Sequence, residues 1–395
     1  MLYHILSILP VFVCLFWFIL LVAGTKENNN SKRFLTIFMF ICIINYSIHA
    51  LYFNHYYQLY AMLESIWVFT SLSVYPLYYY YIRLLTIDVK YNWKWFWTLL
   101  PSLLIATFTA IIYLLMSPLE VQSFVLGKVY NMQKYMPDGS LMIKLQMWRM
   151  AIFKVLFAIQ VFITVFFGIK LILNYNIEIR KYYSNVDKKD LSPIIRLLWL
   201  FVFTSLASLL VSFLGKDYFI YHPTLLMLPS GIFSTLLFGI GYLGYKQEFT
   251  IQQFAKDISD YSLKKKLLKN KKNKTDDKTG YKDTREQLFR LFEYDEIFKN
   301  PELRITDVAF ILGTNRTYVS RAINEETHSN FCEWVNEFRV KYAKKILADT
   351  ETGDLPLSRI AEMSGFSSES SFYRVFKEKE NISPGNYRKR LETRS

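Results

Sequence analysis

The chain has 395 residues, of which 52% are hydrophobic and 18% aromatic, with 33 Phe and 29 Tyr. The length allows two or three domains, and so large an aromatic share exceeds what the core of a water-soluble enzyme needs. Its three cysteines, Cys14, Cys42 and Cys332, exclude a disulfide framework, since two lie in apolar runs and the third in a polar region.

The net charge of +14 is distributed unevenly. Before Tyr245 there are 18 Lys and Arg against 9 Asp and Glu, and from Tyr245 onward there are 29 against 24. Sparse charges with a basic bias are typical of loops between membrane spans, whereas dense mixed charges are typical of a domain in water. We therefore expect a membrane half followed by a water-exposed half.

Seven apolar stretches of about 20 residues precede Tyr245, and each predicts a membrane-spanning helix. The first lacks a basic start and is longer than a cleavable signal, so we expect it to be retained. The seven stretches are Leu2–Ala23, Phe34–Phe53, Leu59–Ile82, Trp95–Met116, Met150–Leu173, Ile194–Leu214 and Pro223–Gly244.

Basic residues in the loops predict the orientation. The loops after the first, third and fifth stretches hold ten Lys and Arg, against five in the alternate loops. Because basic loops stay in the cytoplasm, the N-terminus is predicted outside and the chain after Tyr245 inside, in a bacterial inner membrane.

Four histidines and one carboxylate fall near the predicted outer edge of the membrane half. Such groups indicate either a surface that senses a ligand, a metal or protons, or polar residues that face headgroups and water. Their spacing matches no metal site, and no constellation of nucleophile, base and phosphate-binding glycines predicts an enzyme or a cofactor. The residues are His4, His49, His55, Glu64 and His222.

The junction between the halves has two parts. Residues 247–262 carry an apolar stripe of Ile251, Phe254, Ile258 and Tyr261, typical either of a coiled coil between two subunits or of a helix on the inner leaflet. Residues 264–274 include seven lysines and no acid, a pattern typical of a disordered tail or linker, with anionic lipid and DNA phosphates as candidate contacts. We therefore place domains at 1–245, 246–283 and 284–395.

The region after the linker contains a repeated helical pattern. Ala309, Gly313 and Val319 have the spacing of a helix-turn-helix, with Thr306 as the expected N-cap of its first helix. About fifty residues later, Ala361 and Gly365 repeat the spacing. An amphipathic helix over 331–347 would join the two units, and such a pair can present two recognition helices about 34 Å apart, one turn of the duplex.

The segment Glu302–Arg390 resembles the AraC family of bacterial transcription regulators. The similarity rests on four patches in order, which include Asp307-Val308-Ala309, Trp334-Val335-Asn336, Arg374-Val375-Phe376-Lys377 and Ser383-Pro384. The resemblance implies an all-helical double helix-turn-helix that binds promoter DNA. It does not extend to the membrane half.

The resemblance also implies which residues face DNA. Arginine can read guanine with two hydrogen bonds, but Arg321 and Arg374 could equally contact phosphate without reading sequence. Glu369 either accepts from cytosine or stabilises its own helix start. The implied contacts are Arg316, Thr317, Ser320 and Arg321 on the first recognition helix, and Glu369, Ser370 and Arg374 on the second, with Lys377 near phosphate.

The sequence thus predicts an all-α protein with a seven-span membrane domain and a double helix-turn-helix domain. The favoured function is a membrane-embedded, sequence-specific transcription regulator that couples an unknown cue to promoter binding. Its expected partners are double-stranded DNA, the lipid bilayer, an unknown ligand and a second copy through residues 247–262. The alternative is a transporter or receptor whose C-terminal domain is a regulatory appendage.

Overall fold

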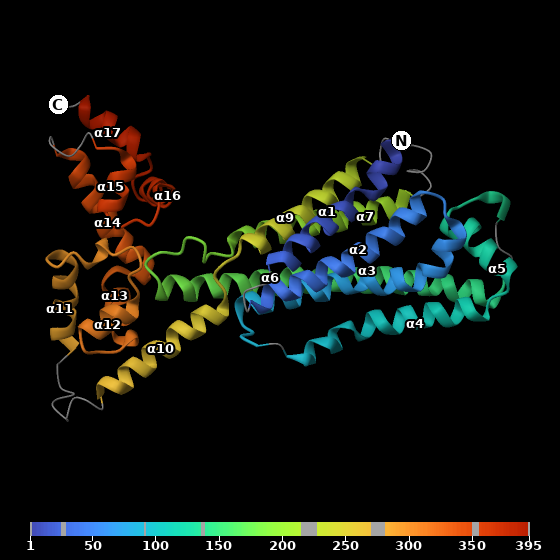
Figure 1. The fold of residues 1–395 in the computed structure, drawn as a ribbon, viewed down its shortest axis with the longest axis horizontal. Helices are drawn as coiled ribbons and strands as arrows, with labels where there is room; N and C mark the ends of the chain where they lie inside the picture. The colour runs from blue at the N-terminus through green and yellow to red at the C-terminus, as the bar shows by residue number, and fades with distance from the viewer. Residues whose placement is uncertain are drawn as a thin grey trace. The chain divides into compact units, whose positions relative to one another are not determined.

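The computed structural model describes residues 2–24, 29–90, 92–135, 139–214, 227–269, 281–349 and 355–393. Every regular element in these ranges is a helix, as expected for an all-α protein (Figure 1). The chain divides into two compact units, one formed by residues 1–173 and 191–252 and the other by residues 174–190 and 253–395. The second unit therefore includes a short segment from the middle of the chain.

The first unit is a bundle of long helices. Neighbouring pairs are α1 with α2 and α9, α2 with α3, α3 with α4, and α7 with α9. Its elements are α1 (Leu2–Gly24), α2 (Asn30–Phe53), α3 (Tyr57–Thr86), the 3-10 helix η1 (Trp93–Leu99), α4 (Leu100–Leu115), α5 (Pro118–Gln122), the π-helix η2 (Ser123–Val129), the 3-10 helix η3 (Gln133–Tyr135), α6 (Leu141–Tyr182), α7 (Ser192–Leu214) and α9 (Met227–Lys246).

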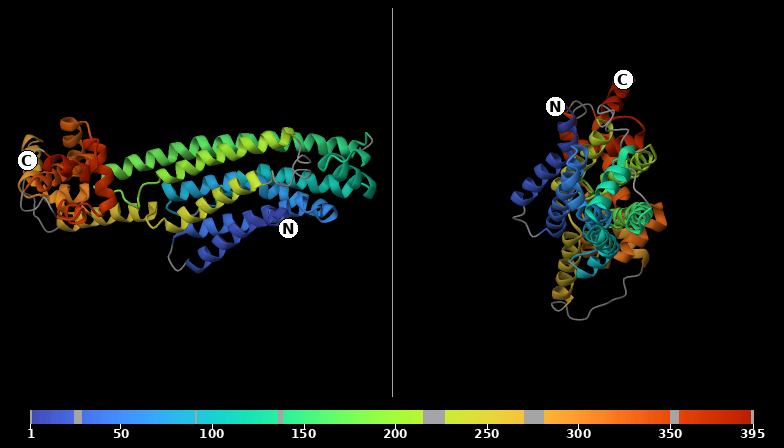
Figure 2. Two further views of the ribbon diagram at one scale, coloured as in Figure 1. Left: turned by 90° about the horizontal axis from the view of Figure 1, so that it is seen from above. Right: turned by 90° about the vertical axis from the view of Figure 1, so that its right-hand side faces the viewer.

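Small and aromatic residues set the packing of this bundle. A Cβ added at Gly241 of α9 would lie 2.2 Å from the Trp17 ring, so the absence of a side chain lets α9 approach α1. On α6, a Cβ added at Gly168 would lie 3.1 Å from Ile82 of α3 and 3.3 Å from Leu198 of α7, closer than ordinary van der Waals contact, and α6 and α7 run side by side (Figure 2). Small residues at helix contacts are typical of membrane bundles.

Five helices in the described part of the chain are long and apolar enough to cross a membrane, judged by length and composition alone. The third predicted span, α3, is not among them because its tyrosines and Glu64 lower its hydropathy. The sixth predicted span, α7, is also not among them, because only its apolar part Ser192–Leu206 is described in full. The five are His4–Gly24, Asn30–Phe53, Trp93–Leu115, Leu141–Tyr182 and Met227–Leu263.

An ion pair is buried inside the first unit. Arg149 Nη2 of α6 lies 2.7 Å from Glu64 Oε1 of α3, and the two side chains are 2% and 3% exposed. Tyr113 of α4 donates to the other carboxylate oxygen, and Gln146 accepts from Arg149 Nε at 2.9 Å. The pair therefore joins α6 to α3 through two buried side chains, and Tyr113 adds α4.

The second unit is built from shorter helices around two apolar clusters. One cluster is formed by residues of α14, α15, α16 and α17 around Phe372 and Phe376, and in the other Phe292 and Phe338 pack against Trp334. The elements are α10 (Ile251–Lys269), α11 (Tyr281–Glu293), the 3-10 helix η5 (Ile297–Lys299), α12 (Ile305–Ile311), α13 (Arg316–Thr327), α14 (Phe331–Ala348), α15 (Leu357–Met363), α16 (Glu369–Glu380) and α17 (Pro384–Glu392).

Candidate DNA-binding surface

The first helix-turn-helix consists of α12 and α13. Gly313 takes φ +65° between the two helices, a conformation that favours glycine, and buried Val319 packs α13 inward. Asn315 caps α13 by accepting from the backbone N–H groups of Thr317 and Tyr318 at 3.0 and 3.1 Å. The expected N-cap at Thr306 was wrong, since α12 begins at Ile305 and the carboxylate of Asp307 accepts from the backbone N–H of Arg304 at 3.0 Å.

The second helix-turn-helix consists of α15 and α16. Gly365 takes φ +82°, and a Cβ at this position would lie 2.5 Å from the backbone oxygen of Phe298 in η5. Ser368 caps α16 by accepting from the backbone N–H of Ser371 at 3.1 Å. Both spacings that predicted a turn therefore contain a glycine in the left-handed region.

The helix α14 joins the two helix-turn-helix motifs, as the amphipathic pattern predicted. Asn330 caps it and Glu333 completes a capping box, and Ser383 likewise caps α17 ahead of Pro384. One residue departs from the pattern, because Arg339 is 1% exposed and does not lie on the polar face. Burial lowers the pKa of its guanidinium to about 10.

The predicted contacts on α13 lie at its solvent-facing side. Arg316, Thr317 and Arg321 are exposed and Ser320 is half-buried. Arg321 also forms an ion pair with Glu325 one turn along the same helix, at 2.8 Å. Because both partners of that pair are exposed, the ion pair contributes little to stability.

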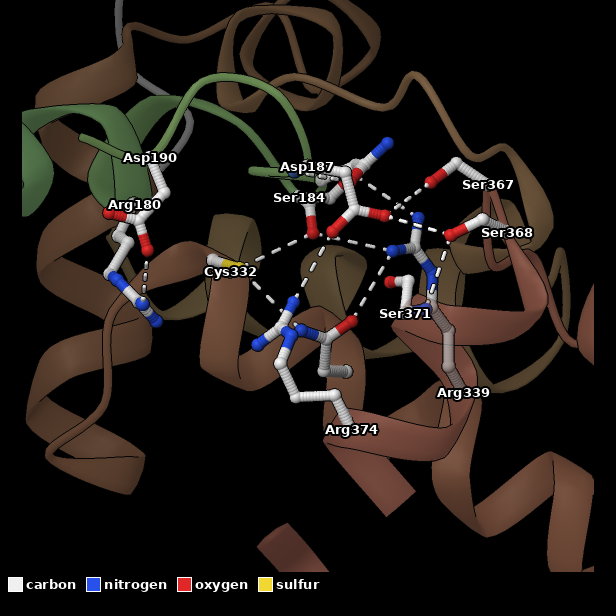
Figure 3. A network of polar contacts seen from close by, with 12 residues as sticks. Arg180, Ser184, Asp187, Asp190, Cys332, Arg339, Ser367, Ser368, Ser371 and Arg374 are labelled. Carbon is white, nitrogen blue, oxygen red and sulfur yellow. Dashed lines mark hydrogen bonds and ion pairs between the residues drawn. The ribbon is translucent and has the colours of Figure 1, made fainter. Parts of the chain in front are cut away.

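The predicted contacts on α16 are exposed as well, but one of them is already engaged. Glu369, Ser370 and Lys377 are exposed without a role in the core, whereas Arg374 lies 3.4 Å from the carboxylate of Asp187. Figure 3 shows this carboxylate between Arg374 and the serines that begin α16. Asp187 belongs to the segment after α6. From the sequence, only the basic residues of this segment were considered, as a sign of membrane orientation, and no contact with α16 was predicted.

The residues of the predicted outer surface lie near one end of the bundle, at the start of α1 and around the α2–α3 turn. His4 Nδ1 pairs with Asn54 Oδ1, and His55 Nδ1 lies 3.1 Å from the hydroxyl of Tyr57. His49 is half-buried and stacks against Trp67. Glu64, in contrast, is enclosed in the ion pair described above, and His222 lies outside the described residues.

The apolar stripe of the junction makes contacts within the same chain. Phe254 of α10 packs edge-on against Tyr182, with ring centroids 5.2 Å apart. On the same helix, Asp257 accepts from the hydroxyl of Tyr183 and forms an ion pair with Arg304 at 3.2 Å. Part of the stripe therefore packs on the end of α6, a third arrangement beside the coiled coil and the leaflet helix. The lysine run 264–274 falls mostly outside the residues whose side chains are described.

Comparison with known proteins assigns the class of this domain. A family described as a helix-turn-helix domain matches residues 308–390. These residues therefore form an AraC-type helix-turn-helix domain, which confirms the resemblance, and the family is one of transcription regulators and not of enzymes.

Curated relatives share this domain and little else. The "Uncharacterized HTH-type transcriptional regulator YtdP" of Bacillus subtilis is 32% identical over 108 residues, 27% of this chain and 13% of that protein. The "TCP pilus virulence regulatory protein" of Vibrio cholerae is 33% identical over 84 residues, 21% of this chain and 29% of that protein. The chain thus spans less than a third of the length of either.

Two further similarities follow the same pattern. The "Regulatory protein PocR" of Salmonella typhimurium is 27% identical over 109 residues, 28% of this chain and 35% of that protein. A solved structure, the C-terminal domain of AraT, a response regulator from Geobacillus stearothermophilus, is 27% identical and covers 28% of this chain and 83% of its own, with a TM-score of 0.23.

Proposed function

We propose that the protein is a membrane-embedded transcription regulator that reads promoter DNA through α13 and α16. The observation that carries this proposal is the exposure of Arg316, Thr317 and Arg321 on α13 and of Ser370 and Arg374 on α16. Two arginine-bearing helices, each following a tight turn, match the way such modules enter successive major grooves. The long apolar helices of the first unit support attachment to a membrane.

DNA binding by the full chain in lipid nanodiscs tests this proposal. Duplexes enriched by the protein from a random pool should contain paired half-sites about 10 base pairs apart, since this spacing returns the same groove to the same face. Arg321→Ala should weaken binding, while Arg290→Ala, which removes an exposed arginine of α11 outside both helix-turn-helix units, should change it little. Failure of any sequence to enrich at low salt would overturn the proposal.

The same experiment separates base reading from phosphate contact at Arg321 and Arg374. Loss of a base contact costs about 1–3 kcal/mol at one position of the site and relaxes its sequence preference. Loss of a phosphate contact weakens binding to all sequences alike. It also reduces the slope of the logarithm of the binding constant against the logarithm of salt concentration by about one. Binding curves of each alanine variant at three salt concentrations distinguish the two.

We further propose seven spans, with the N-terminus outside and the DNA-binding unit in the cytoplasm. The excess of basic residues in alternate loops supports this topology, and DNA binding requires it. A reporter fused after Tyr245 should be active only in the cytoplasm. Activity on the outer side would rule out the topology and promoter binding together.

The proposed sensing end is formed by His4, His49 and His55, with His222 as a further candidate. Replacing the four histidines together should abolish the response of a bound promoter to the cue. An unchanged response would dispose of an outer sensing surface. Glu64 is left out of this set because its replacement would leave the buried charge of Arg149 unpaired and destabilise the first unit.

A homodimer through residues 247–262 is also proposed. Since Phe254 packs on Tyr182 in the same chain, a second copy would meet the remaining members of the stripe, above all Ile258. Ile258→Asp should lower the mass measured by light scattering from a dimer to a monomer. A monomeric wild-type protein would exclude the dimer without affecting DNA binding by two helix-turn-helix units of one chain.

A further inference from the structure

The segment between α6 and α7 carries an acidic residue to the start of the second recognition helix. In this segment, here called loop 183–190, Asp187 Oδ2 accepts hydrogen bonds from the hydroxyls of Ser367 and Ser368, each at 3.1 Å. Its other oxygen, Oδ1, lies 3.4 Å from Nη2 of Arg374, which follows Ser368 by six residues along α16 (Figure 3). A single carboxylate thus engages three side chains on the exposed side of the helix-turn-helix.

Hydrogen bonds to Ser184 fix loop 183–190 in place, three residues before Asp187. The backbone N–H of Ser184 donates to the carbonyl of Leu303 at 3.0 Å, and the Sγ–H of Cys332 donates to the carbonyl of Ser184 at 3.3 Å. Arg339 donates to both the carbonyl and the hydroxyl of Ser184. Loop 183–190 is therefore docked on α14, and Asp187 is its projecting member.

The chemistry of the contact is that of an anion at a helix start. Backbone N–H groups and the helix dipole favour negative charge at the N-terminus of α16, where DNA-binding helices hold a phosphate. Two hydroxyl donors and a guanidinium are the groups that bind a phosphate oxygen. Asp187 supplies an oxygen pair with one negative charge to the same donors, so it and a DNA phosphate exclude each other.

We propose that Asp187 is an internal competitor of DNA, which masks the second recognition helix until loop 183–190 withdraws. This inference rests on the proposed function, because it presumes that α16 binds DNA. It adds a means of control to that function, since loop 183–190 continues directly from α6, a helix that reaches from the first unit into the second. Movement of α6 would shift Asp187 and so change the number of helix-turn-helix units free to bind.

Asp190 provides a matched control within the same loop. Its carboxylate accepts from Asn176 Nδ2 at 2.7 Å and lies 3.6 Å from Arg180, so it pairs with α6 instead of α16. Asp187→Asn and Asp190→Asn remove the same charge three residues apart. General relief of repulsion toward DNA affects both variants, whereas unmasking of α16 affects only the first.

The test measures DNA affinity of the full chain in nanodiscs, with duplexes enriched by the wild-type protein. Asp187→Asn should tighten binding about two- to fivefold, within the range for partly exposed ion pairs. Asp187→Glu, which keeps the charge, should stay close to wild type, and Asp190→Asn should change affinity less than twofold. A gain in affinity cannot arise from misfolding, so an unstable variant cannot mimic the expected result.

Two outcomes overturn the inference while the proposed function stands. In the first, wild type and Asp187→Asn bind the enriched duplexes equally well. In the second, Asp187→Asn and Asp190→Asn tighten binding alike, which reduces the effect to net charge. If neither wild type nor any variant binds a duplex, the proposed function fails and this inference fails with it.

Discussion

Arg339 donates two hydrogen bonds to Ser184, one to its carbonyl oxygen at 3.3 Å and one to its hydroxyl at 3.1 Å. The same guanidinium donates to the carbonyls of Phe298 and Asn300 at 2.9 and 2.8 Å. Only the planar fork of an arginine can reach acceptors in this many directions. Arg339 thus fastens loop 183–190 and the turn around η5 to one point of α14.

Arg339→Lys should destabilise the second unit although it keeps the charge. An ammonium group cannot serve all these acceptors, and hydrogen bonds to a charged donor are worth about 1.5–3 kcal/mol, so we expect a loss of about 3 kcal/mol. Lys341→Arg is the control, because Lys341 is exposed two residues away on the same helix. Calorimetry of the full chain should show a lower Tm for the first variant only, and equal Tm values would contradict this account of Arg339.

The two turn glycines should differ in their tolerance of alanine. Both have positive φ, which costs a β-carbon about 1–2 kcal/mol. At Gly313 nothing lies within 4 Å of the added atom, whereas at Gly365 it would meet the backbone of Phe298 and Lys299. Gly365→Ala should therefore cost about 1–3 kcal/mol more than Gly313→Ala, in line with other overpacked sites.

Thermal unfolding of the two glycine variants, measured side by side, checks this difference. Equal losses would mean that η5 moves aside at little cost.

In the DNA-binding half, the helix-turn-helix motifs could be predicted because the residues that define each motif lie close together in the sequence. Ala309, Gly313 and Val319 lie within one helix-turn-helix, so their spacing carries the geometry by itself. Gly365 is also required because the backbone of Phe298 leaves no room for a Cβ there. A local pattern could not predict this, since the two residues are 67 positions apart.

Asp187 and Arg339 could not be assigned from sequence for a related reason. Each is an ordinary charged residue among several, Asp187 beside Lys188 and Lys189 and Arg339 beside Lys341. Their roles depend on a loop from the first half of the chain reaching a helix in the second, and no local periodicity records that contact. Glu64 illustrates the same limit, since only its partner on α6 turns an apparent surface group into a buried ion pair.

Glu64→Gln should destabilise the first unit more than removal of the whole ion pair does. The single change leaves Arg149 buried without a counter-charge, at a cost of about 3–5 kcal/mol, whereas a second change, Arg149→Met, removes that buried charge. Glu64→Gln with Arg149→Met should therefore recover much of the Tm lost by Glu64→Gln alone. A double variant as unstable as the sum of both single variants would show that the ion pair is not the source of the loss.

Cys332 should react with thiol reagents only at strongly alkaline pH. Burial raises the pKa of its thiol to about 11, and at pH 8 this leaves about a hundredfold less thiolate than the ordinary value of 9.0 would. Because the pKa is raised in the folded state, its contribution to stability is fully present below pH 9 and is lost as pH rises through 11.

A variant with Cys14 and Cys42 replaced by alanine isolates the Cys332 signal. Its labelling rate should climb tenfold per pH unit up to about pH 11. A plateau near pH 9 would mean that the thiol is open to water, which would also contradict the docking of Ser184 over it.

The covalent attachment of Asp187 to the same chain as α16 affects which DNA sequences the protein selects. Asp187 is covalently attached to its target, so its local concentration at α16 is on the order of millimolar, whatever the amount of protein in the cell. Chromosomal DNA without the right sequence binds such modules with a Kd of about 10⁻⁴–10⁻⁶ M, and an attached competitor weakens each of these encounters equally. Only a site that gains from both helix-turn-helix units would overcome this threshold, so an aspartate that reads no base would sharpen the choice of promoter.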